Sequence, residues 1–282
     1  MVPDMGATDV VIYAYGLVPS DYRGQPTRFP AGVDDAPVEL HDTGVCGVIL
    51  SRLPTSGYSP ARIEQSSGDV AWLSPRAMAH DRVLTWAQEH GGGVVPLPMF
   101  TMFGSDDALA KSLEERRDGI ARVFRKVHGA DEFGVRIHRR QEQMLSAIDR
   151  LDPELAALRR EAAGAPPGQR YLLERKIDER SKSSVRAASQ RIAREIYDSL
   201  RDIARDAVAR PLTPDASRAD VTLVLNGAFL VDRAKVDAFR AAVGAHMRDQ
   251  EPNGLVFDFT GPWPPYNFVA DAVGGDGEAA RS

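Results

Sequence analysis

Two kinds of spacing between hydrophobic residues recur along the chain, and each predicts one kind of secondary structure. Short runs of β-branched and aromatic residues predict strands, at residues 10–17, 38–40, 45–50, 94–98, 133–137, 221–225 and 255–260. Asp42-Thr43-Gly44, between the second and third of these runs, suits a tight hairpin. Apolar residues three or four positions apart predict helices, at residues 74–90, 105–127, 140–151, 169–210 and 233–247. Strands and helices are mixed without regular β-α-β-α alternation, which predicts an α+β fold.

Capping residues and helix breakers predict where several of these helices begin and end. Ser74 and Pro75 predict a helix start, because serine is a good N-cap and proline fits the first helical position. Ser105 caps the next helix in the same way. Residues 164–168 (GAPPG) must interrupt the helical pattern that surrounds them.

The predicted helix of residues 169–210 is highly charged but has one apolar face. That face contains Val185, Ala188, Ile192, Ile196, Leu200, Ile203 and Ala207. Basic and acidic residues are interspersed over the remaining positions, as on a solvated face with i,i+4 ion pairs. The helix therefore packs within the protein or docks a partner, and in the second case Arg191 and Arg194 are candidate contacts.

A chain of 282 residues is long for one compact domain, so we expect two. We place an N-terminal α+β domain at residues 1–131 and a C-terminal α+β domain, which contains the long helix, at residues 132–269. Each is compatible with a ferredoxin-like sandwich. Residues 270–282 are small, polar and rich in glycine, which predicts a disordered tail.

The composition narrows the classes of partner. The formal net charge is −5, whereas a generic nucleic-acid binder is more often basic, so we expect no nucleic-acid partner. No basic segment precedes the first apolar run, and no window approaches the roughly 20 apolar residues of a membrane-spanning helix. We expect a cytoplasmic protein with no membrane partner. Cys46 lies in an apolar run and should be a buried, unreactive thiol.

Few residues suggest catalysis. His90-Gly91-Gly92-Gly93 is similar to the oxyanion-hole segment of some α/β-hydrolases, but the chain lacks their G-x-S-x-G nucleophile elbow. The glycines also fit the end of a helix. The six histidines show no metal-ligand spacing, and only His80 with Asp81 is compatible with an acid–base role. We expect no enzymatic activity, no metal and no cofactor; a hydrolase-like enzyme using His80, Asp81 and residues 90–93 is the alternative.

A stiff aromatic turn at residues 261–266 (GPWPPY) follows the last predicted strand. Its prolines restrict the backbone, which favours one conformation of the turn. Trp263 and Tyr266 then either close the edge of a core or serve as exposed anchors for a partner. Together with Pro264 they are candidate partner contacts.

Five segments stand out together along the chain. They are Tyr13-Ala14-Tyr15-Gly16-Leu17, the run from Ala79 to Phe103 with Val94-Val95-Pro96-Leu97, Phe133-Gly134-Val135-Arg136-Ile137, Tyr171-Leu172-Leu173 to Lys176, and Asn226–Val231 with Leu255–Val269. In this order they span nearly the whole chain, residues 10–269, and resemble the gas vesicle GvpL/GvpF family. Within them, Pro98 and Met99 stand where the family usually has Arg-Phe.

The resemblance implies an accessory protein of gas vesicle formation that is not an enzyme. Members of this family are thought to bind the small, apolar major shell subunit and to support nucleation or assembly of the shell. The implied partners are that subunit and other gas vesicle accessory proteins, and the implied location is the gas vesicle in the cytoplasm. The implied fold is two α+β domains, the second modified ferredoxin-like. A homotypic scaffold joined through the long helix is a further alternative.

Overall fold

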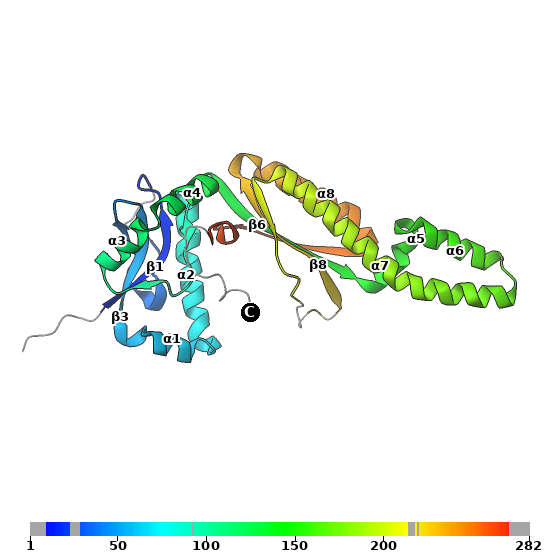
Figure 1. The fold of residues 1–282 in the computed structure, drawn as a ribbon, viewed down its shortest axis with the longest axis horizontal. Coiled ribbons are helices and arrows are strands. Elements are labelled where there is room, and N and C mark those ends of the chain that lie inside the picture. Colours follow the sequence, from blue (N-terminus) through cyan, green and yellow to red (C-terminus); the bar gives the residue numbers. More distant parts are fainter. Residues whose placement is uncertain (1–9, 23–28, 92, 214–217, 219, 271–282) are drawn as a thin grey trace, which may run out of the picture. The chain divides into compact units, whose positions relative to one another are not determined.

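The computed structural model describes residues 10–22, 29–91, 93–213, 218 and 220–270 (Figure 1). The chain divides into two compact units, each with its own sheet and helices. Unit 1 contains the described residues up to Asp131 together with the C-terminal segment that begins at Trp263, and unit 2 is Glu132–Pro262. The predicted α+β class is confirmed. The predicted tail lies outside the described residues, apart from Ala270.

Unit 1 is built on a five-stranded sheet of order β2-β3-β1-β4, in which β5 also pairs with β1. The strands are β1 (Val10–Val18), β2 (Glu39–Asp42), β3 (Gly47–Pro54), β4 (Val95–Pro96) and β5 (Met102–Phe103). The predicted hairpin of β2 and β3 is confirmed, since the two strands pair antiparallel from Glu39 opposite Leu50 to Asp42 opposite Gly47. The Asp42 carboxylate accepts a 2.9 Å hydrogen bond from the backbone N–H of Gly44, which has a positive φ of 77°.

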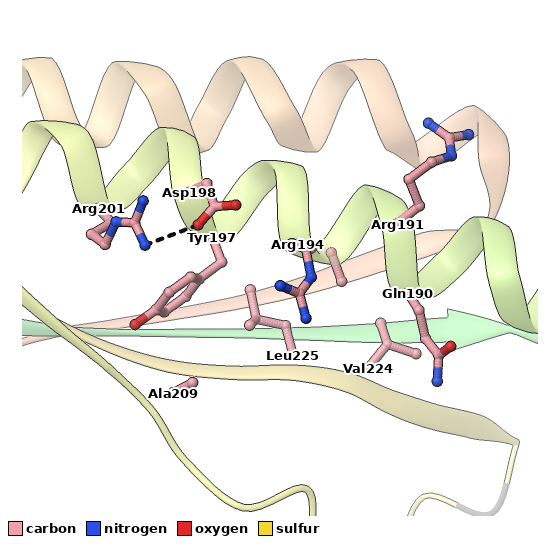
Figure 2. Close-up of a pocket in the computed structure, with 10 residues that line it drawn as sticks. Gln190, Arg191, Arg194, Tyr197, Asp198, Arg201, Ala209, Val224 and Leu225 are labelled. Carbon is pink, nitrogen blue, oxygen red and sulfur yellow. Dashed lines mark ion pairs between the residues drawn. The ribbon is translucent and has the colours of Figure 1, made fainter.

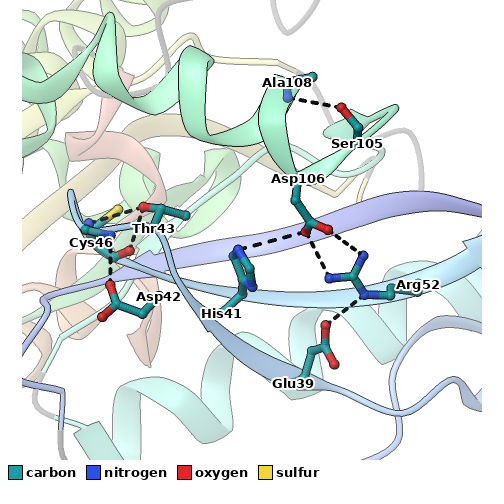
Figure 3. Close-up of polar contacts among 10 residues, drawn as sticks. Glu39, His41, Asp42, Thr43, Cys46, Arg52, Ser105, Asp106 and Ala108 are labelled. Carbon is teal, nitrogen blue, oxygen red and sulfur yellow. Dashed lines mark hydrogen bonds and ion pairs between the residues drawn. The ribbon is translucent and has the colours of Figure 1, made fainter.

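Four helices belong to unit 1, namely α1 (Pro60–Ser66), α2 (Val70–Gly91), α3 (Asp106–Glu114) and α4 (Arg117–Val127). The predicted cap of α3 is confirmed, because Ser105 Oγ accepts a hydrogen bond from the backbone N–H of Ala108. Arg52 of β3 binds Asp106 with both terminal nitrogens, at 3.2 and 2.9 Å, and also binds Glu39 (Figure 3). These contacts fasten the start of α3 to the sheet, and the Arg52 guanidinium lowers the pKa of Asp106.

The predicted start of α2 at Ser74 and Pro75 is wrong. The helix begins one turn earlier, where Asp69 Oδ1 accepts a 2.9 Å hydrogen bond from the backbone N–H of Ala71, and Pro75 lies inside the helix. A proline there removes the N–H that would bind the carbonyl of Ala71. Residues 70 and 71 are exposed, so water can solvate that carbonyl in place of the lost bond.

Unit 2 has a four-stranded sheet of order β7-β8-β6-β9. Its strands are β6 (Ala130–Arg140), β7 (Asp206–Ala209), β8 (Val221–Asp232) and β9 (Leu255–Trp263), and its helices are α5 (Gln141–Leu151), α6 (Pro153–Gly164), α7 (Pro167–Ile203) and α8 (Val236–Gln250). The order along the chain is β6, the helices α5 to α7, the strands β7 and β8, the helix α8 and the last strand β9. This β-α-β-β-α-β order is the one that a ferredoxin-like sandwich has; the ferredoxin-like description itself stays a prediction.

Helices α7 and α8 run side by side and pack on the sheet of unit 2 (Figure 1). The core between them contains Phe133 of β6, Phe229 of β8 and Phe239 of α8, all fully buried. Most of the apolar face predicted for α7 contributes to this core, since Val185, Ala188, Ile192, Ile196 and Leu200 are buried.

The predicted extent of the long helix, residues 169–210, is wrong at its C-terminal end. Helix α7 stops at Ile203, Ala204 is extended, and Asp206–Ala209 forms strand β7. Ala207 continues the helical spacing of the apolar face, but it pairs with Phe229 in the sheet. Tertiary strand pairing thus overrides local helical periodicity at this point.

Candidate partner-binding surfaces

One exposed apolar surface in unit 1 is formed by Met78, Trp86, Trp263 and Tyr266, which we call the Trp263 surface. Met78 and Trp86 lie on α2, and Trp263 and Tyr266 belong to the C-terminal segment. Met78 is 69% exposed, Trp263 39% and Tyr266 41%. Met78, Trp86 and Trp263 line a shallow groove of about 440 Å³, with Asp81, Arg82 and Glu89 among its polar neighbours.

The C-terminal segment that presents these aromatic rings is fixed to unit 1 at several points. The Tyr266 hydroxyl donates a 3.2 Å hydrogen bond to Asp81 Oδ1 on α2. Phe268 and Val269 are buried, and the Lys126 ammonium of α4 lies 5.4 Å from the centre of the Phe268 ring. Residues 263–269, which the sequence groups with the C-terminal domain, therefore contact unit 1. The exposed rings are held by a rigid support.

The sequence-predicted contacts of this turn separate into two kinds. Trp263 and Tyr266 are exposed and available to a partner. Pro264 is buried, as is Pro265, so Pro264 supports the turn from beneath and presents little surface. Met78 was missed by the sequence prediction, although it falls outside the apolar stripe of Ala79 and Val83 and should have been recognised as an exposed apolar residue.

His80 and Asp81 are neighbours on α2 but face different environments. His80 is buried, its Nδ1 lies 2.9 Å from the Tyr13 hydroxyl, and desolvation lowers its pKa to about 4. Asp81 instead accepts the hydrogen bond from Tyr266 at the surface. His80 is therefore a neutral core residue at physiological pH, and no carboxylate in the described part of the chain pairs with it.

The glycine segment ends α2, as the helix C-cap interpretation predicts. A Cβ on Gly91 would lie 1.5 Å from the ring of Tyr22, so the absence of a side chain lets that ring pack against the helix end. Gln88 links this end of α2 to two later residues. Its Nε2 donates a 2.7 Å hydrogen bond to the Asp131 carboxylate, and its Oε1 accepts a 3.0 Å hydrogen bond from the backbone N–H of Val94. His80 lies eleven residues before Gly91 on the helix, about 16 Å away by helical rise. Gly92 lies outside the described residues.

A second surface, in unit 2, is a groove of about 800 Å³ between α7 and the strands β7 and β8, which we call the α7 groove (Figure 2). Its lining residues are Gln190, Arg191, Ala193, Arg194, Tyr197, Asp198, Arg201, Ala209, Val224 and Leu225. Gln190, Arg194, Tyr197 and Arg201 are spaced so that they follow one side of the helix. Both predicted arginine contacts, Arg191 and Arg194, therefore belong to one groove.

The arginines of the α7 groove differ in their partners. Arg191 binds Glu195 at 3.0 Å and Arg201 binds Asp198 at 3.1 Å, both within α7. Arg194 has no ion pair with any residue in the described part of the chain. Figure 2 shows Arg194 and Tyr197 extending from the helix toward the strands, whereas Arg191 extends away from them. Arg194 is thus the cation that remains available in the groove.

Metal-binding clusters and membrane-spanning helices are both absent from the part of the chain that the structure describes. Among residues 10–22, 29–91, 93–213, 218 and 220–270, no group of three or more His, Cys, Asp and Glu side chains is arranged to hold a metal ion. Within the same ranges, no helix has the length and hydropathy needed to cross a lipid bilayer.

Comparison with known proteins gives a consistent result along the chain. The family model described as gas vesicle synthesis protein GvpL/GvpF matches residues 11–270. Gas vesicle protein L of Streptomyces sp. (strain CB03234) is 28% identical over 94% of this chain and 95% of its own length. Gas vesicle protein F1 of Halobacterium salinarum is 33% identical, with the same two coverages. The crystal structure of GvpF from Anabaena sp. PCC7120 has the same fold, with a TM-score of 0.68 at 18% identity over 92% of this chain and 98% of that one. The chain belongs to the gas vesicle GvpL/GvpF family.

Proposed function

We propose that this protein binds the major shell subunit of the gas vesicle and supports nucleation or assembly of the shell. Its family gives it an accessory role in gas vesicles. Binding of the shell subunit is the more specific step, and other gas vesicle accessory proteins are proposed as further partners.

The single observation that carries this proposal is the Trp263 surface. An exposed tryptophan, tyrosine and methionine on a fixed support form the kind of anchor that dominates protein–protein interfaces. Because Phe268 and Val269 hold the segment from below, little conformational entropy is lost when a partner covers the rings. Tryptophan and methionine also match an apolar partner better than a charged one.

The chemistry of shell assembly calls for such a surface. A strongly apolar subunit exposes surface that aggregates before it is assembled. A protein that covers part of this surface with its own aromatic side chains keeps the subunit available for growth of the shell. The acidic and basic residues around the groove, Asp81, Arg82 and Glu89, keep the free surface soluble.

Co-purification tests the proposal. The tagged protein and the major shell subunit are expressed together, and retention of the subunit is measured at several salt concentrations. Trp263→Ala should weaken retention by about 2 kcal/mol or more, which is the size of a central aromatic anchor. Tyr171→Ala is the matched control, because Tyr171 is a 65% exposed tyrosine of unit 2.

The possible outcomes distinguish an error in the proposed function from an error in the proposed binding surface. If the wild-type protein retains no subunit at any salt concentration, the proposed function is wrong. If wild type and Trp263→Ala retain equal amounts, the protein binds the subunit elsewhere and the assignment to the Trp263 surface is wrong.

A further inference from the structure

The C-terminal segment of unit 1 has a docked side and an exposed side. Trp263 and Tyr266 are exposed, at 39% and 41%. The buried residues of the segment are Pro264, Pro265, Phe268 and Val269. Residues 263–269, which we call the latch, therefore rest on unit 1 with one side and present two aromatic rings on the other.

Local backbone bonds and prolines give the latch a shape of its own. The N–H of Tyr266 donates a 2.8 Å hydrogen bond to the carbonyl of Pro264, and the N–H of Phe268 donates a 3.1 Å hydrogen bond to the carbonyl of Pro265. Both bonds begin and end inside the latch. The two prolines also restrict its backbone. These features do not depend on the rest of unit 1, so the latch keeps its shape when it leaves that unit.

Among the side chains that hold the latch on unit 1, Phe268 contributes most. Phe268 is 3% exposed, and the Lys126 ammonium of α4 lies 5.4 Å from the centre of its ring. The hydrogen bond from the Tyr266 hydroxyl to Asp81 lies at the surface. Burial of a phenylalanine ring stabilises a contact more than one exposed hydrogen bond does. The contacts of Phe268 therefore decide whether the latch is docked.

The groove at the Trp263 surface needs the latch as one of its two walls. Among the described residues that line it, those other than Trp263 all belong to α2, namely Met78, Asp81, Arg82, Thr85, Trp86 and Glu89. A single helix has a convex surface, so α2 alone offers no groove. Undocking of the latch separates Trp263 from Met78 and Trp86 and thereby removes the groove.

We propose that the latch docks and undocks as one piece, that Phe268 controls this equilibrium, and that a partner at the Trp263 surface stabilises the docked state. The inference rests on the proposed function for the identity of the partner, the major shell subunit. A partner that contacts α2 and Trp263 together binds the docked state alone, so partner binding and docking stabilise each other by the same factor. Phe268 is buried beneath the latch and is a positioning residue that acts through Trp263.

Docking also sets the apparent affinity for the partner. The measured dissociation constant is the intrinsic constant divided by the docked fraction. The buried side chains of Phe268 and Val269 keep that fraction near one in the wild-type protein. A variant that lowers the docked fraction to about one tenth weakens partner binding about tenfold, although it removes no atom that the partner contacts. A support that never opens would show no such linkage.

Thiol labelling measures docking without any partner. In a Cys46→Ala background, Val269→Cys supplies a single thiol at a position that is 4% exposed. A maleimide should label this thiol roughly a hundredfold or more slowly than in the urea-unfolded protein. The rate should depend little on low urea concentrations, because undocking exposes little surface. Phe268→Ala should speed labelling roughly tenfold or more, whereas Phe268→Leu, which keeps a large apolar side chain, should speed it by about threefold or less.

The native Cys46 reports whether unit 1 stays folded when the latch opens. In Phe268→Ala with Val269 and Cys46 unchanged, the buried Cys46 should remain as unreactive as in wild type. If Cys46 becomes reactive, Phe268→Ala has unfolded unit 1. In that case Phe268→Leu and the effect of the partner on labelling decide the question.

The linkage is measured with the co-expressed shell subunit. Phe268→Ala should retain about tenfold less subunit than wild type, whereas Phe268→Leu and the control Tyr171→Ala should stay close to wild type. In the other direction, saturating subunit should slow labelling of the Val269→Cys variant about tenfold. A purely structural role of Phe268 would not produce this second effect.

Each outcome bears on a different part of the inference. Labelling of Val269→Cys as fast as in urea would overturn docking of the latch. Equal retention by wild type and a folded Phe268→Ala variant, or labelling that bound subunit does not slow, would overturn the linkage. Failure of wild type to retain any subunit would overturn the proposed function and with it the linkage, whereas slow labelling would still establish docking.

Discussion

Tyr266 and Asp81 are 185 positions apart in the sequence, and the hydroxyl of one donates a 3.2 Å hydrogen bond to the carboxylate of the other. The bond joins the C-terminal segment to α2 and thereby orients the aromatic rings of the Trp263 surface. The bond also gives Asp81 a structural role. The sequence suggests Asp81 as an acid–base partner of His80, but in the structure its carboxylate holds the Tyr266 hydroxyl at the surface.

A double-mutant cycle measures this bond. Tyr266→Phe and Asp81→Ala should each lower the free energy of unfolding, and the coupling between them should be about 0.5–1 kcal/mol, the net value of one partly exposed hydrogen bond. Urea unfolding of the four proteins gives the coupling. Strictly additive effects would show that the two residues act independently. Tyr266→Phe keeps the ring and should still retain the shell subunit.

His80 makes the stability of unit 1 dependent on pH. Its pKa is lowered from 6.5 to about 4 in the folded protein, because burial disfavours the charged ring. The unfolded chain therefore binds more protons between these two values, so the free energy of unfolding decreases as the pH falls from about 6.5 to about 4. We expect His80 to lower the free energy of unfolding by on the order of 2–3 kcal/mol as the pH falls across this window.

The measurement is the difference between wild type and His80→Gln in urea unfolding at several pH values. The variant should be less stable at pH 7 but should lose this part of the pH dependence, because glutamine does not titrate. His246→Gln, at a surface histidine that lies 3.2 Å from Ser199, is the control. Parallel stability curves for wild type and His80→Gln would contradict a buried neutral His80.

Gly91 has a structural role that a substitution can measure. Gly91→Ala places a Cβ 1.5 Å from the Tyr22 ring, so the ring must move out of its contact with the helix end. We expect a loss of about 1–3 kcal/mol in the free energy of unfolding, as for an overpacked site. Gly68→Ala is the control, because a Cβ there meets nothing within 4 Å. Equal stability of both variants would contradict this packing.

Cys46 should be unreactive in the folded protein. It is fully buried, and desolvation raises the pKa of its thiol to about 11, so the nucleophilic thiolate is scarce at neutral pH. Ellman's reagent should label it only in denaturant, at a rate that follows unfolding. Rapid labelling of the native protein would show that the segment just before β3 opens locally far more often than the burial of Cys46 indicates.

The sequence predicted most elements whose formation depends on local signals. The Ser105 cap, the hairpin around Gly44 and the apolar face of α7 all result from neighbouring residues and appear where predicted. The early start of α2 was missed because Asp69 was not recognised as a cap. The end of α7 was missed because Ala207 continues the helical spacing, and only pairing with its distant partner Phe229 places it in a strand.

The candidate surfaces were predictable to different degrees. Trp263 and Tyr266 are conspicuous in a proline-rich turn, but their alignment with Met78 depends on contacts between distant parts of unit 1. Arg194 is one of many arginines in α7, and nothing local distinguishes it. Its availability becomes visible only when Arg191 and Arg201 are seen paired with Glu195 and Asp198.

Gas vesicle counts by electron microscopy test the central claim, that shell formation depends on the Trp263 surface. The coding sequence is deleted in the strain that carries it and is then restored as wild type, Trp263→Ala with Met78→Ala, or Tyr171→Ala. We predict that vesicles are lost on deletion, restored by wild type and Tyr171→Ala, and not restored by the double variant at equal protein level. Normal vesicle numbers in the deletion strain, or full restoration by the double variant, would contradict the claim.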